Sequence, residues 1–184
     1  HLKRVILIIS VFVFLAVVGW FFIFKPYQKA RLSVFLNPES DPLGASYNVI
    51  QSKIAIGSAG FWGKGFGQGT QTHLKFLPEA ETDFIFAAFM EEWGLLGVLI
   101  LLLTFLSVIF RILNVGLRTQ NNSYRFVSLG TALVLLIHFF VNVGSNLGLT
   151  PVTGITFPFV SYGGSSLLTL AILVSIMQRI KFEF

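Results

Sequence analysis

The fold class is decided by residues 126–178, FVSLGTALVLLIHFFVNVGSNLGLTPVTGITFPFVSYGGSSLLTLAILVSIMQ, which contain no Asp, Glu, Lys or Arg. An apolar run of about 20 residues crosses the hydrocarbon core of a bilayer as a helix. The stretch is too long for two such helices and too short for two helices with a hydrophilic loop. The excess falls on residues 150–166, where prolines and glycines exclude a continuous helix. We therefore predict a broken or re-entrant segment there, buried in protein or lining a wet cavity.

Outward from this stretch, further apolar runs predict an all-α polytopic membrane protein with four transmembrane helices. The predicted spans are residues 5–24, 84–113, 126–149 and 167–180. A mean hydropathy of +0.80 with 11% charged residues excludes a water-soluble domain of average composition. Basic residues flank the N-terminus, the 114–125 connection and the C-terminus, which places all three in the cytoplasm and the loop of residues 25–83 outside.

Composition also excludes several chemistries. The chain has no Cys and only three scattered His, so disulfides, thiolate nucleophiles and the usual Cys or His metal sites are not expected. The net charge is +5, but its carriers lie beside span ends and in one loop, so we expect no nucleic-acid partner. Because the chain opens on His1, two basic residues and a span, we interpret it as a fragment without its N-terminal part. The first apolar run is too long for a signal peptide.

The external loop contains a glycine-rich stretch, residues 57–69, interleaved with aromatic residues. It is not a phosphate-binding P-loop, because Gly65 stands where Ser or Thr must follow Lys64. We predict a flexible loop with its aromatics at the headgroup level, preceded by a short interfacial helix around Tyr47–Ile54. Lys53 and Lys64 are candidates for contact with anionic headgroups or pyrophosphate. A solvated loop without chemical consequence is the alternative.

The segment LPEAETDFIFAAFMEEWGLLG, residues 77–97, is the most informative for chemistry. Thr82 or Asp83 could simply cap the helix that follows. The helical wheel favours another interpretation, because it places Asp83 above a face of small residues suited to close helix contact. An ionisable residue directed into a helix bundle is a functional candidate. Glu91 lies off this face, and we expect it to pair with a cation or to be protonated.

Two further groups of polar residues lie in the charge-free stretch. His138, Asn142, Ser145 and Asn146 share a stripe for which interhelical hydrogen bonding is a sufficient explanation. Ser161–Ser165 could form a tight turn, in which Gly163 and Gly164 would be needed for backbone conformation, or could present backbone N–H groups to an anion.

Five ordered motifs make the chain recognisable. They are FLNPESDPLGASYNVIQSKIAIGSAGFWGKG (residues 35–65), GTQ (69–71), LPEAETDFIFA (77–87), EEWGLLG (91–97) and PFVSYGGSS (158–166). Together they resemble the SEDS family of shape, elongation, division and sporulation proteins, on its elongation side rather than its division side. Ala59, Glu81 and Trp93 depart from the usual family residues.

The resemblance implies the C-terminal four helices of a ten-helix, GT-C-like fold in the bacterial cytoplasmic membrane. It implies an inverting peptidoglycan glycosyltransferase that polymerises lipid II, with a class B penicillin-binding protein as partner. The essential acid of the family corresponds to Asp83. The pyrophosphate leaving group needs cations, supplied by side chains or by Mg²⁺ or Mn²⁺. The candidate substrate-binding residues are Lys53, Lys64, Glu79, Thr82, Ser161, Tyr162, Gly163, Gly164 and Ser165.

Two other functions remain open from the sequence. A lipid II flippase or permease would also use a broken helix and intramembrane polar residues. A non-catalytic scaffold for a penicillin-binding protein would need only the helices and the loop.

Overall fold

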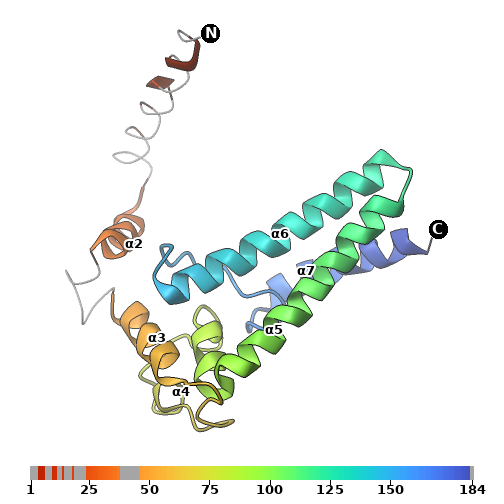
Figure 1. Cartoon of the computed structure of the whole chain (residues 1–184). Coiled ribbons are helices and arrows are strands. Elements are labelled where there is room, and N and C mark those ends of the chain that lie inside the picture. Colours follow the sequence, from red (N-terminus) through yellow and green to blue (C-terminus); the bar gives the residue numbers. More distant parts are fainter. Residues whose placement is uncertain are drawn as a thin grey trace.

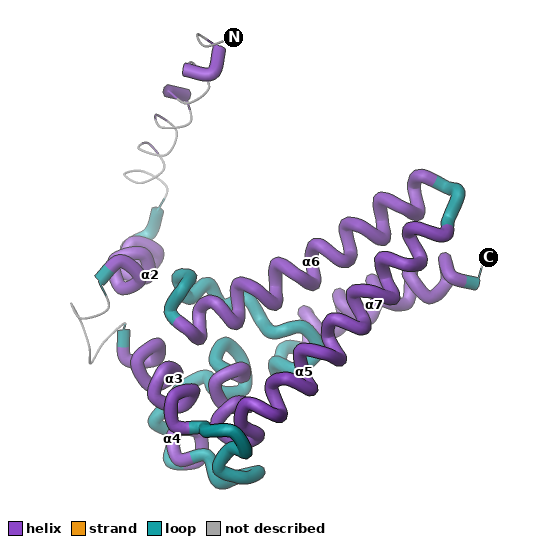
Figure 2. Tube along the Cα trace, viewed as in Figure 1, coloured by secondary structure: helices purple, strands orange, loops and turns teal. Residues whose placement is uncertain are grey.

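The computed structural model describes residues 24–37 and 46–182, with a few isolated residues before Phe24. Most of the predicted first span, residues 5–24, lies outside the described residues. Within the described part, the secondary structure is helical and without strands (Figures 1 and 2), which confirms the predicted all-α class. The helices are α2 (Pro26–Leu36), α3 (Tyr47–Ser58), α4 (Thr70–His73), α5 (Ile85–Arg118), α6 (Asn122–Leu147) and α7 (Gly164–Lys181).

The two longest helices, α5 and α6, form an antiparallel hairpin (Figure 1), and each is long and apolar enough to cross a membrane. Residues 119–121 connect them, and Asn121 Oδ1 accepts a hydrogen bond from Ser123 N at 2.9 Å to cap α6. The connection is shorter than the predicted 114–125. Counting apolar residues finds only the part of each helix suited to lipid, whereas backbone hydrogen bonding continues into the polar ends.

Helix α7 lies behind this hairpin and contacts both of its helices (Figure 1). Aromatic rings fill the shared core, where Phe105 of α5 and Phe139 of α6 stack with centroids 4.8 Å apart. Phe157, from the segment between α6 and α7, lies 5.4 Å from Phe139 and is almost fully buried. The segment between these helices is therefore anchored in the protein core. The crossing of the membrane by α7 itself stays a prediction.

Helix α5 is interrupted at Gly94, whose φ of 66° and ψ of −168° are not helical. The loop of residues 60–65 pairs with the break: Lys64 N donates to Glu91 O at 2.9 Å, and Leu95 N donates to Gly60 O at 3.1 Å. A Cβ atom on Gly94 would overlap the backbone of Gly63, so the loop backbone packs directly against the α5 backbone at these two glycines. Residues 60–65 of the predicted flexible loop are therefore hydrogen-bonded to the α5 backbone.

The same break corrects the predicted helix face. Gly94 and Gly97 are both buried, but the partner at Gly94 is loop backbone rather than another helix. The helical-wheel prediction assumed one unbroken helix from Asp83 to Gly97. The helical register is interrupted at Gly94, and Asp83 itself lies in the turn before α5.

We expect Gly94→Ala to destabilise the protein by about 2 kcal/mol or more, because alanine is strained at positive φ and its Cβ would displace the loop backbone. Thermal unfolding of the purified full-length protein measures the effect. Gly130→Ala is the matched control, since Gly130 is helical and has open space around its Cβ position. Equal melting temperatures for the two variants would contradict the close approach at Gly94.

Candidate functional site

The turn before α5 is held from α6 by two asparagines. Asn142 Nδ2 and Asn146 Nδ2 both donate to the backbone carbonyl of Asp83, at 3.1 and 2.9 Å. Asn146 Oδ1 also accepts from Ala87 N at 3.1 Å. These are the interhelical hydrogen bonds expected of the polar stripe on α6. His138, on the same helix, has a buried Nδ1 without a hydrogen-bond partner among the described residues.

The broken segment is fastened to the same turn. Residues between α6 and α7 are non-helical, in agreement with the break predicted at 150–166. Ser161 Oγ donates to Thr82 O at 2.7 Å, and Tyr162 N donates to Glu81 O at 2.8 Å. A Cβ atom on Gly154 would lie 3.7 Å from Asp83 Oδ2. The structure therefore brings the broken segment and the candidate acid together.

The Asp83 side chain is not a helix cap. Helix α5 begins after Phe84, without a side-chain capping bond, and the Asp83 carboxylate makes no hydrogen bond within the described residues. Its side chain is partly exposed. The pKa of Asp83 is raised above its ordinary value. Burial is the largest cause and the negative charge of Glu79 adds to it, whereas the positive charge of Arg31 opposes both. The backbone of Asp83 is thus fixed and its carboxylate is free to accept a proton.

Arg31, on α2, is the site residue that the sequence reasoning missed. One of its guanidinium nitrogens donates to Val152 O, in the broken segment, at 2.9 Å. Its charge acts on Asp83, as the pKa direction indicates. Nothing in the spacing of the loop cations distinguishes Arg31 from the others, so no local sequence signal could have selected it.

Lys64 and Lys53 have neighbours other than Asp83. Lys64 Nζ forms an ion pair with Glu91 at 2.8 Å. Glu91 is fully buried and also accepts hydrogen bonds from the single turn of α4, including Gln71 N at 2.9 Å and Thr72 Oγ1 at 2.7 Å. A cation therefore pairs with Glu91, one of the two outcomes expected for it. Lys53 is exposed beside the end of α6, where a Cβ atom on Gly148 would lie 2.6 Å from Lys53 Nζ.

The remaining candidate residues divide into two groups. Glu79 and Thr82 lie in the turn with Asp83, joined by a hydrogen bond from Thr82 Oγ1 to Glu79 Oε2 at 2.8 Å. Gly163, Gly164 and Ser165 lie at the start of α7. The conformational reason predicted for the two glycines is wrong, because Gly163 has an extended φ of −172° and Gly164 is helical. The non-glycine Phe159 has the positive φ, 64°, in this region.

Comparison with known proteins shows the family to which the chain belongs. The family model described as cell cycle protein, FtsW/RodA/SpoVE, matches residues 1–183. The chain belongs to this family. Its members are membrane proteins, in agreement with the two membrane-capable helices of this chain.

Individual relatives are similar at high identity. The chain is 52% identical over 151 residues to the peptidoglycan glycosyltransferase MrdB of Escherichia coli (strain K12), covering 82% of this chain and 41% of MrdB. It is 43% identical over 159 residues to the peptidoglycan glycosyltransferase RodA of Treponema pallidum (strain Nichols), covering 86% of this chain and 37% of RodA. The chain thus spans about two fifths of the length of these relatives.

A solved structure has the same fold. The match has a TM-score of 0.73 at 31% identity and covers 97% of this chain and 48% of the other. That structure is described as the structural coordination of polymerization and crosslinking by a peptidoglycan synthase complex.

Proposed function

We propose that this protein is a peptidoglycan glycosyltransferase that polymerises lipid II for cell-wall elongation and rod shape. Family membership and the names of the relatives support this proposal. The observation that carries it is the arrangement at Asp83: a carboxylate that makes no hydrogen bond among the described residues, on a backbone held by α6 and under the electrostatic influence of a cation on α2.

The reaction joins two lipid-linked sugar chains with inversion at the reacting carbon. A sugar 4-hydroxyl attacks the anomeric carbon of the second chain, the bond to the pyrophosphate oxygen breaks, and Asp83 accepts the hydroxyl proton. Burial makes Asp83 a stronger base than an exposed aspartate. Arg31 faces the negative charge that develops on the leaving pyrophosphate. Inverting glycosidases use a carboxylate base in the same chemical role.

The other candidate residues have supporting roles in this proposal. Glu79 and Thr82 shape the turn that presents Asp83, and Ser161 and Tyr162 fasten the broken segment to it. Gly163, Gly164 and Ser165 would offer backbone N–H groups to the substrate at the start of α7. Lys53 and Lys64 remain candidates for contact with the lipid headgroup at the rim of the loop.

A divalent cation, Mg²⁺ or Mn²⁺, is compatible with the side chains around Asp83. The described residues contain no group of three or more His, Cys, Asp or Glu side chains that could hold a metal. Mg²⁺ commonly uses one or two carboxylates together with substrate phosphates, and Asp83 and Glu79 lie close enough to influence each other. Such an ion would neutralise charge on the pyrophosphate.

The proposed setting is the bacterial inner membrane, with four spans in this chain, residues 25–83 outside, and a class B penicillin-binding protein as partner. The similar synthase complex supports the partner. We expect an impermeant thiol reagent to label a cysteine placed at Ser58 in intact cells but not one placed at Asn121. Both residues are exposed, so access alone decides the labelling. The reverse pattern would overturn the topology.

The activity is tested by a chain-elongation assay with labelled lipid II, using the full-length protein with its partner. A glycosyltransferase makes glycan polymer, whereas a flippase moves the lipid without making polymer. A scaffold would support complex formation equally well after Asp83 is changed. Absence of polymer from a folded, partner-bound protein would contradict the proposal.

A further inference from the structure

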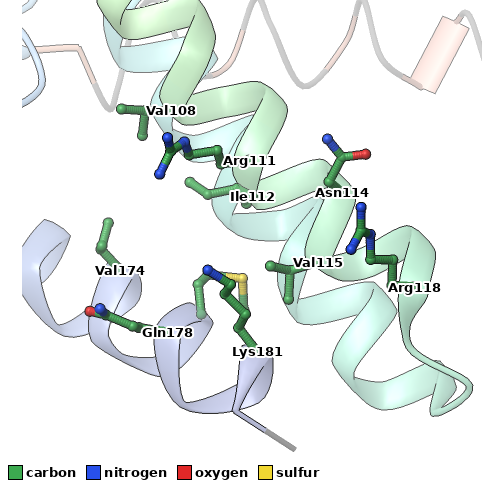
Figure 3. A pocket seen from close by; sticks show the side chains of 10 residues that line it. Val108, Arg111, Ile112, Asn114, Val115, Arg118, Val174, Gln178 and Lys181 are labelled. Carbon is green, nitrogen blue, oxygen red and sulfur yellow. The ribbon is translucent and has the colours of Figure 1, made fainter. Parts of the chain in front are cut away.

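A cavity between α5 and α7 lies at the opposite end of these helices from Asp83. Its volume is about 800 Å³, and it is lined by α5 and α7 (Figure 3). The two helices run in the same direction, and both end near the turn that joins α5 to α6 (Figure 1). In the topology proposed above, this end faces the cytoplasm.

The lining of the cavity is amphipathic. Val108 and Val174 form part of its wall away from the helix ends, and Arg118 and Lys181 line it at the ends. Arg111 also lines it, seven residues before the end of α5, which is about 10 Å deeper at the rise of an α-helix. In Figure 3 the side chains of Arg111 and Lys181 lie in the space between α5 and α7.

The side chains of Arg111, Arg118 and Lys181 make no ion pair or hydrogen bond within the described residues. Between Glu92 and Glu183 the sequence has no acidic residue. Topology and the helix dipole account for basic residues at the ends of helices. They do not account for the gathering of three of these cations around one cavity whose inner wall is apolar, which provides both a positive charge and a surface for hydrocarbon.

We propose that this cavity binds an anionic phospholipid of the cytoplasmic leaflet. The phosphate would lie among Arg111, Arg118 and Lys181, and an acyl chain would lie along Val108 and Val174. Cationic clefts between membrane helices on this side suit anionic headgroups, and the apolar wall suits the chain attached to them. This site is separate from Asp83, and lipid binding there does not depend on the proposed polymerase activity.

Native mass spectrometry of the detergent-solubilised full-length protein tests the proposal. The protein is titrated with phosphatidylglycerol and with phosphatidylcholine of the same acyl chains. We expect tighter binding of phosphatidylglycerol and an about fivefold loss of its affinity in Arg111→Gln. The matched control is Arg179→Gln, on α7 but outside the cavity lining, which should leave the affinity unchanged. Arg111→Lys keeps the charge and should keep the preference, which separates binding from folding.

Three results would overturn the proposal. Equal affinity for the two lipids would remove the role of the cations. Equal losses in Arg111→Gln and Arg179→Gln would indicate general attraction to a basic surface. Absence of bound lipid would indicate that the cavity is filled by another part of the full-length protein. Glycerol 1-phosphate should not displace the lipid, since it lacks the chain that contacts Val108 and Val174.

Discussion

Asp83→Asn should lower glycan polymerisation by about 10² to 10⁴, the usual cost of losing a general base. Asparagine has nearly the same size, and the backbone carbonyl that accepts from Asn142 and Asn146 is unchanged. The fold should therefore persist while the proton acceptor is lost. The measurement is the rate of polymerisation of labelled lipid II by the full-length protein with its partner, at equal folded amounts.

Glu81→Gln is the control for this change. Glu81 is exposed, lies two residues from Asp83 and interacts with the broken segment through its backbone carbonyl. Its substitution removes the same charge from the same turn without removing the proposed base, so its rate should stay near that of the wild type. A rate for Asp83→Asn within a few-fold of the control would exclude Asp83 as the base.

The broken segment could be predicted because it follows from the length of the charge-free stretch. A charge-free stretch too long for two helices must bury its excess, and its prolines and glycines locate that excess. The pairing of Glu91 with a cation was likewise accessible, since a buried carboxylate needs compensation. Lys64 as its partner was not, because a loop residue 27 positions away can reach Glu91 only after the loop has folded.

The break at Gly94 and the nearness of Arg31 to Asp83 were not predictable for a different reason. On a helical wheel, Gly94 is a small residue suited to contact with another helix. The pattern cannot show that loop backbone occupies the space beside Gly94. Arg31 and Asp83 are separated by two further helices, α3 and α4, along the chain. Periodicity describes one element at a time, and this proximity depends on how several elements pack.

The second large effect is expected at Arg31. Arg31→Gln should lower polymerisation by about 10², in the range observed when one electrostatic contact to a developing charge is removed. It removes the cation whose charge lowers the pKa of Asp83 and which we propose to face the pyrophosphate. Arg31→Lys should give an intermediate rate, because lysine keeps the charge but lacks the planar guanidinium that can hold Val152 O and an anion together.

The contact with Val152 provides a competing explanation, since Arg31 could act only by holding the broken segment in place. In that case Arg31→Gln would lower the melting temperature, and the rate per folded molecule would stay near the wild-type value. Lys75→Gln removes an exposed cation of the same loop and controls for a general loss of positive charge at the membrane surface. A binding role for Arg31 therefore requires three results together: a loss of rate at equal folded amounts, partial recovery in Arg31→Lys, and little change in Lys75→Gln.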